Sequence, residues 1–189
     1  DAGINVDLII QATHEGTSND ITFTVNEPDL DQAREVTQSV LNSLGGELSA
    51  EGGLTKLSIS GAGIMGRPGI AASLFNGLCQ QGINLRLIAT SEVKVSCVIA
   101  ATSGRKALQA VRDAFEVADS QVAINPPLSG ENEPEVRGVA LDRDQVQLSV
   151  RHVPDRPGIA AALCSSLADN SISIDAIVQS ERQHADGSR

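Results

Sequence analysis

The hexapeptide RPGIAA occurs twice in this chain, at residues 67–72 and again, unchanged, at 156–161. The surrounding blocks, 66–91 and 155–180, align without gaps at an offset of 89 residues, and their apolar positions match throughout. A third, partial match joins AGINVDLIIQAT at 2–13 to QGINLRLIATSE at 81–92. Because self-similarity at a fixed spacing marks a repeated structural unit, the sequence predicts three copies of one module.

The middle copy is complete, and its pattern predicts an order of strands and helices. Residues 55–61 alternate polar and apolar side chains, which is the period of a half-buried strand. Pro68 begins a helix that Gly82 ends, with apolar side chains recurring at helical spacing between them. Further strands are expected at 84–91, 93–100 and 121–124, and a second amphipathic helix at 104–117. The order βαββαβ indicates an α+β, ferredoxin-like module.

The outer copies contain only halves of this module. The first copy supplies the second half, and the third copy supplies the strand–helix–strand of the first half. In the first copy we expect strands at 4–12, 20–26 and 46–51 and a helix at 28–44. The predicted boundaries are 1–52 for the first copy, 54–125 for the middle copy, 126–143 for a proline-rich linker and 144–189 for the third copy. Because the chain opens on Asp1 and enters a strand pattern at once, we expect a piece of a longer polypeptide.

Composition restricts the partners. A net charge of −10 and a pI near 4.6 argue against nucleic acid or an anionic membrane, both of which need a basic surface. No apolar run approaches the ~20 residues that span a bilayer. Three cysteines without a C-x-x-C pair indicate buried thiols in a reducing compartment, the cytoplasm or a plastid stroma. Small, zwitterionic ligands remain compatible with this chain.

The repeated Pro-Gly corner is a candidate binding element. A helix that begins directly after a strand has unpaired N–H groups and a partial positive charge at its first turn, so it can receive a carboxylate. Gly69 and Gly158 carry no Cβ that would keep a ligand away from the backbone. Pro-Gly after a strand is, however, often no more than a well-formed helix start. The corner alone therefore leaves both interpretations open.

The second strand of the module favours the binding interpretation. Asp7 and Asp175 are each followed four positions later by a glutamine, Gln11 or Gln179. A carboxylate and an amide near a helix N-terminus could hold the ammonium and side chain of a free amino acid. The middle copy has Asn84, Arg86 and Thr90 at these positions, so we expect that it has lost this role.

Two longer segments carry a family resemblance. GINVDLIIQ with NDITFTV, and LSISGAGIMGRPGIAASLF with GINLRLIATSEVKVSCVI, resemble the regulatory region of aspartate kinases, which is built from tandem ACT domains. TSEVKVSCVI is the most specific part, and the second RPGIAA block resembles the duplicated, four-domain type of cyanobacteria. The resemblance implies ferredoxin-like ACT domains in tandem and feedback control of the enzyme that phosphorylates aspartate with ATP. Lysine, threonine or both would bind where ACT domains pair side by side in a homodimer.

The resemblance also implies effector-binding residues. One pocket would combine a strand of the first copy with the start of the middle copy's second strand, and lysine-type sites would use the turn after that strand. These residues are Asn5, Val6, Asp7, Gln11, Asn84, Leu85, Ser91 and Glu92. The third copy would supply a pocket half made of Asp155, Gly158, Ala160, Ser173, Asp175 and Gln179. Ser173 stands where the family usually has Asn, so selectivity for threonine stays open there.

We expect no catalytic residue, metal site or cofactor in this chain. It has no glycine-rich phosphate loop, and its three histidines lack a metal-ligand spacing. ATP and Mg²⁺ would belong to a kinase domain outside these residues. Two alternatives remain: a structural dimerisation module without a ligand, and an ACT module of another amino-acid enzyme, such as an acetolactate synthase regulatory subunit.

Overall fold

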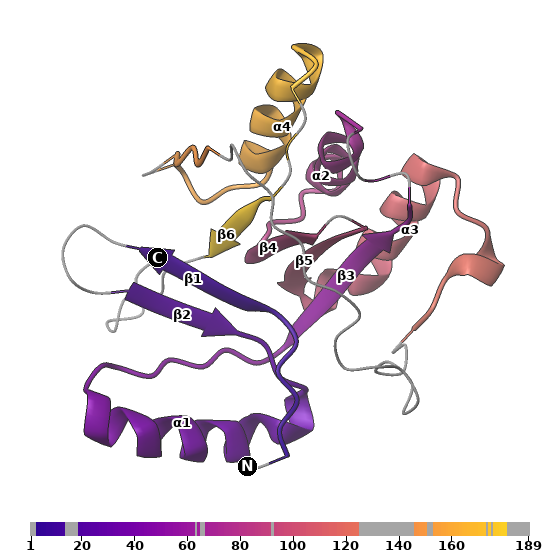
Figure 1. The fold of residues 1–189 in the computed structure, drawn as a ribbon. Helices are drawn as coiled ribbons and strands as arrows, with labels where there is room; N and C mark the ends of the chain where they lie inside the picture. The colour runs from indigo at the N-terminus through magenta and orange to yellow at the C-terminus, as the bar shows by residue number, and fades with distance from the viewer. Residues whose placement is uncertain are drawn as a thin grey trace.

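The structure, a computed structural model, describes residues 3–13, 19–62, 64, 67–91, 93–124, 146–150, 153–172, 174 and 176–180 (Figure 1). In chain order the strands are β1 (Ile9–Thr13), β2 (Asn19–Phe23), β3 (Leu54–Ser60), β4 (Leu87–Ser91), β5 (Lys94–Ala100) and β6 (Val178–Ser180). The α-helices are α1 (Leu30–Leu44), α2 (Ile70–Gln80), α3 (Gly104–Phe115) and α4 (Ile159–Asp169). Short 3-10 turns occupy Glu27–Asp29, Ala101–Ser103 and Asp119–Gln121.

The middle copy has the ferredoxin-like α+β arrangement that its sequence predicts, apart from its last strand. Strands β3, β5 and β4 form an antiparallel sheet, and β6 of the third copy extends it to the order β3-β5-β4-β6. Helices α2, α3 and α4 lie on one face of this sheet (Figure 1). The side chains of β5 explain the layering, because Val95, Cys97 and Ile99 join the core under the helices while Val98 packs into a second cluster on the opposite face.

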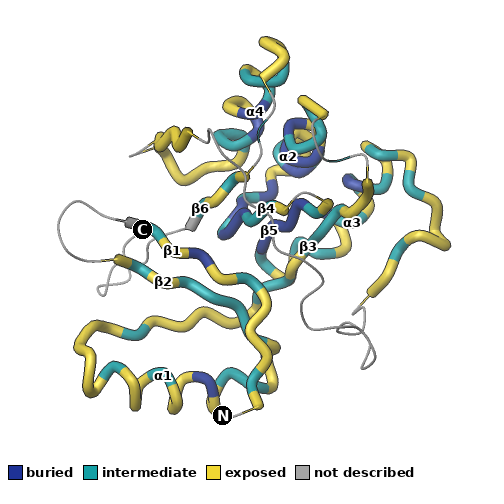
Figure 2. The backbone as a smooth tube through the Cα atoms, in the orientation of Figure 1, coloured by how far each residue is buried: buried dark blue, intermediate teal, exposed yellow. Residues whose placement is uncertain are grey.

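Helix α2 follows the predicted pattern closely. Leu74 and Leu78, four positions apart, are fully buried, and Phe75 between them is 1% exposed (Figure 2). The helix ends at Gln80, and Gly82 follows in a left-handed conformation with φ of 68°. There the N–H of Gly82 donates to the carbonyl of Cys79 at 2.8 Å, which satisfies a carbonyl at the helix end.

The first copy covers the other face of the central sheet. Its β1–β2 hairpin lies between α1 and the sheet, so the layers follow the order helix, hairpin, sheet, helices (Figure 1). Ile10 of β1, 3% exposed, packs with Leu87 and Val98 on the helix-free face. On α1 only Ala33 is buried, and Leu44 at its end is 78% exposed.

Three predicted strands are wrong in the structure, and one of them is the strand expected before the helix of the third copy, because residues 146–150 are irregular. Residues 122–124 form no strand, because a 3-10 turn at Asp119–Gln121 precedes them and the Gln121 side-chain oxygen accepts the N–H of Ala118 at 3.2 Å. Residues 46–51 are also irregular, following the left-handed glycines Gly45 and Gly46. The strand expected at 4–12 is confirmed only as Ile9–Thr13. Residues 46–51 and 122–124 contain apolar side chains, but no strand in the described part of the chain pairs with them.

Candidate functional site at the pairing of two copies

Both Pro-Gly corners form the N-terminal caps of helices. Gly69 precedes α2 with φ of 97°, and Gly158 precedes α4 with φ of 101°, so both need the left-handed conformation that glycine adopts freely. The carbonyl of each glycine accepts the first helical N–H at 2.8 Å, from Ser73 and Ala162 respectively. The two corners are therefore the same local structure as well as the same sequence.

The middle and third copies pair about a local twofold axis. Asn76 Nδ2 donates to Ser165 Oγ at 3.0 Å, and these two residues are equivalent, 89 positions apart. In the ladder between β4 and β6, Ala89 pairs with Val178, which is again its own equivalent. Helices α2 and α4 pack beside each other above this ladder (Figure 1). The pairing reproduces within one chain the self-complementary interface of a symmetric dimer.

This symmetry sets each helix tip against the end of the partner helix. A Cβ built on Gly158 would lie 2.9 Å from Cys79 Sγ, and a Cβ built on Gly69 would lie 3.9 Å from Cβ of Ala168. Cys79 and Ala168 occupy equivalent positions in the repeat. At Gly158 the missing Cβ thus serves helix packing in addition to the left-handed backbone.

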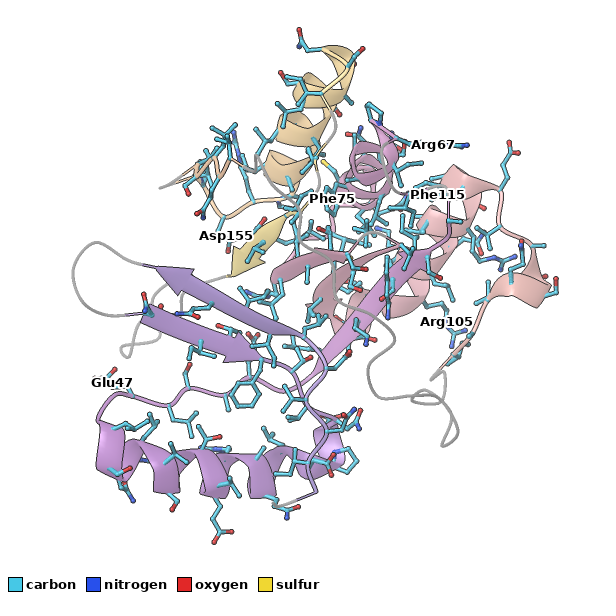
Figure 3. All side chains as sticks on the ribbon, in the orientation of Figure 1. Glu47, Arg67, Phe75, Arg105, Phe115 and Asp155 are labelled. Atoms are coloured by element: carbon cyan, nitrogen blue, oxygen red, sulfur yellow. The ribbon has the colours of Figure 1, made fainter. Side chains whose placement is uncertain are left out.

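The corner of the third copy also meets the middle copy's second strand at its start. Asn84 Nδ2 donates to Asp155 Oδ1 at 2.7 Å. Asp155, labelled in Figure 3, lies shortly before the start of α4. Asn84 is half-buried, Asp155 is exposed, and the bond crosses from one copy to the other. A proline-primed helix tip and a strand start therefore do face each other closely, although they come from different copies.

The other predicted residues of the first pocket have partners or environments of their own. Asp7 is paired with Lys56 of β3, and Leu85 is buried in the core. Asn5 and Gln11 are exposed, and Val6 is 39% exposed. Asn84, which the sequence assigned to the first copy's pocket, instead contacts the third copy. The remaining pairings stay predictions.

The residues predicted for the lysine-type site and for the third copy's pocket lie in several different elements. Ser91 is exposed in the β4–β5 turn, where its Oγ donates to the Lys94 carbonyl at 3.5 Å. Ala160 packs against the core in the first turn of α4, and Gln179 pairs with Ile88 on the inner edge of β6. Glu92, Ser173 and Asp175 lie outside the described residues.

Sequence reasoning missed three interface residues. Cys79 faces the Gly158 tip, and Thr90 Oγ1 accepts the N–H of Ile177 at 2.8 Å across the β4–β6 edge. Arg86 Nη2 lies 3.6 Å from Glu51 Oε1 and so ties the middle copy to the end of the first. For Cys79 and Thr90 the offset of 89 residues was the available signal, because a twofold between the middle and third copies requires equivalent helix ends and strand edges to meet.

Two thiols resist ionisation because they are buried. Burial raises the pKa of Cys97 from 9.0 to about 12 and that of Cys164 to about 11. Cys79 is half-buried. Across the described ranges, no three His, Cys, Asp or Glu side chains gather in a way that could hold a metal ion, and no helix there is long and apolar enough to cross a membrane.

Comparison with known proteins agrees with this geometry. Models of the ACT domain match residues 57–115 and 146–188. The crystal structure of aspartate kinase from Synechocystis superposes with a TM-score of 0.84 at 46% identity, over 95% of this chain and 31% of that one. The ligand-free regulatory subunit of aspartate kinase from Thermus thermophilus is 37% identical over 60% of this chain and 75% of its own, with a TM-score of 0.56. The chain belongs to the aspartokinase family.

The match covers the regulatory part of this family. An aspartokinase of Bacillus sp. (strain MGA3) is 37% identical over 120 residues, which are 63% of this chain and 29% of that protein. The chain thus spans about a third or less of the full-length relatives it matches. The Synechocystis likeness extends over nearly the whole chain, including the third copy, whereas the Bacillus and Thermus matches stop at about 60% of it. The additional RPGIAA block is therefore shared with the cyanobacterial structure.

Proposed function

We propose that this aspartokinase region senses free lysine or threonine at its paired ACT domains and thereby controls the phosphorylation of aspartate by ATP in the complete enzyme. The observation that carries the proposal is the bond between Asn84 and Asp155, which joins a helix tip of one copy to a strand start of the other. Family membership supports the regulatory role, and the pairing of the two copies supplies the interface.

The site offers complementary groups to a zwitterion. The first N–H groups of α4 present a partial positive charge, to which an α-carboxylate is attracted. Asp155 presents an exposed carboxylate beside them, which could take an ammonium by a charge-assisted hydrogen bond. Asn84 can donate from its nitrogen or accept at its oxygen, so it can exchange its bond to Asp155 for one to a ligand.

Calorimetric titration with lysine and with threonine tests the proposal. We expect saturable heat from at least one of them, and a loss of about 1.5–3 kcal/mol in binding free energy for Asp155→Ala, the worth of a hydrogen bond to a charged group. From the sequence, Asp175→Ala should abolish binding as well. Asp113→Ala on α3 is the matched control, because Asp113 bonds only to Gln109 among the contacts we describe and lies away from α4. Unchanged affinity in Asp155→Ala would contradict the assignment of this corner.

The second candidate function is a structural pairing module without a ligand. One observation favours it: α2 and α4 pack directly against each other, with Ala161 and Cys164 buried against the shared core. This function predicts no heat with either amino acid while the chain still self-associates in sedimentation. Binding heat together with association would instead support an effector-responsive homodimer.

A further inference from the structure

One short segment of the middle copy touches both of the other copies. Asn84 bonds to Asp155 of the third copy, and two residues later Arg86 is paired with Glu51 at the end of the first copy. The next residue, Leu87, packs against Ile10 of the β1–β2 hairpin and begins β4, which pairs with β6. We call residues 84–87 the junction segment. The corner proposed to bind an effector and the contacts to the first copy thus lie within four consecutive residues.

Buried and backbone contacts hold the junction segment in place, in addition to its more exposed side chains. Leu85 between the two polar residues is buried in the core, and the N–H of Arg86 donates to the Val98 carbonyl at 2.9 Å. The Arg86 side chain is only 14% exposed and that of Glu51 33%. Ion pairs with this degree of burial are less screened by solvent than fully exposed ones. A shift of Asn84 would therefore also displace Leu85 and Arg86.

The identity of Arg86 fits this role. The equivalent positions in the first and third copies carry aspartate, Asp7 and Asp175. Asp7 pairs with Lys56 of the middle copy, and Arg86 pairs with Glu51, so each charge joins the first copy to the middle copy with the signs exchanged. The arginine that stands in the middle copy where the other copies have aspartate thereby supplies a second cross-copy ion pair. These two pairs accompany the apolar contact of Ile10 with Leu87 and Val98.

We infer that the junction segment couples effector binding at the Asp155 corner to the docking of the first copy on the central sheet. This inference rests on the proposed function. Docking of the first copy fixes the start of β4 and so holds Asn84 opposite Asp155. A ligand that needs Asn84 in this place binds more tightly to the docked form, and by linkage it stabilises docking by the same factor.

Two variants remove the docking contacts without touching the corner. Glu51→Gln deletes the charge that faces Arg86, and Ile10→Ala deletes the apolar contact with Leu87. We expect Glu51→Gln to weaken effector binding by about threefold to fivefold, the scale that one partly exposed ion pair can transmit. Ile10→Ala should weaken it at least as much, because it removes a buried apolar contact. The matched control is Asp119→Asn, which removes the same kind of charge from a pair with Arg112 inside the middle copy. It should leave the affinity unchanged.

The readouts are calorimetric affinity for lysine and threonine and amide hydrogen exchange in β1 and β2. Saturating effector should slow exchange in the hairpin of the unmodified chain and do so less in Glu51→Gln. Equal affinity in Glu51→Gln, Ile10→Ala and Asp119→Asn, with normal binding by the unmodified chain, would overturn the coupling and leave the proposed function standing. Absence of binding by the unmodified chain would overturn the proposed function and this inference together.

Discussion

At the scale of single residues, the two Pro-Gly corners separate two reasons for a glycine. Gly69 and Gly158 share the left-handed backbone and the helix-capping position. They differ in their surroundings, because only Gly158 approaches the partner helix closely enough that a Cβ would collide with Cys79 Sγ. Sequence identity of the corners therefore conceals different steric demands.

Alanine substitution at both glycines measures this difference. Gly69→Ala should lower the free energy of unfolding by about 1–2 kcal/mol through the left-handed backbone alone. Gly158→Ala should cost about 1 kcal/mol more, because its Cβ must displace the sulfur. Urea unfolding of both variants checks the order, and Cys79→Ala should recover the extra loss at Gly158. Equal losses at the two positions would show that the close approach has no energetic weight.

The buried thiols give a pH dependence of stability. Well below pH 9 Cys97 and Cys164 are protonated in both the folded and the unfolded chain, so they do not alter the free energy of unfolding. Above pH 9 the unfolded thiols ionise while the folded ones hold their protons until about 12 and about 11, so stability should fall as the pH rises.

Urea unfolding at pH 7.5, 9 and 10 checks this direction, and the chain has no tyrosine that would titrate in the same range. Cys97→Val should flatten the decline relative to the unmodified chain. A decline of the same slope in that variant would contradict the role of Cys97.

At the scale of elements, helix patterns were predictable where burial was strong. Helix α2 was predicted because Ile70, Leu74 and Leu78 face one side and Gly82 stops the chain. The strands at 121–124 and 46–51 could not be judged in this way, since a strand needs a partner and the sequence does not say whether one is present. The contact of Asn84 with Asp155 lay beyond local pattern for the same reason. It depends on which copies pair, and local pattern does not determine that.

Two leucines on different helices test how much each element contributes. Leu78→Ala on α2, where the side chain is fully buried, should lower the free energy of unfolding by about 2–5 kcal/mol. Leu44→Ala on α1, where the side chain is 78% exposed, should change it by less than about 0.5 kcal/mol. Thermal or urea unfolding compares the two. Similar losses at the two positions would mean that Leu44 of α1 is buried against a surface that is not seen in this structure.

At the scale of the whole molecule, three copies of one module meet around β4. The third copy pairs with its edge and its neighbouring helix, and the first copy covers the opposite face of its sheet. The copies therefore pack in two ways. The middle and third copies lie side by side about a local twofold axis, and the hairpin of the first copy packs on the face of the middle copy's sheet. The proposed effector site lies at an exposed part of one of these interfaces, within four residues of the other.

The most direct test of that site is a two-dimensional NMR titration of the chain with lysine and with threonine. The account predicts that the Asn84 side-chain amide and the backbone amides of Asp155 and Gly158 shift together and saturate at one ligand concentration. Shifts confined to other parts of the chain, with these three groups unmoved at saturation, would contradict it.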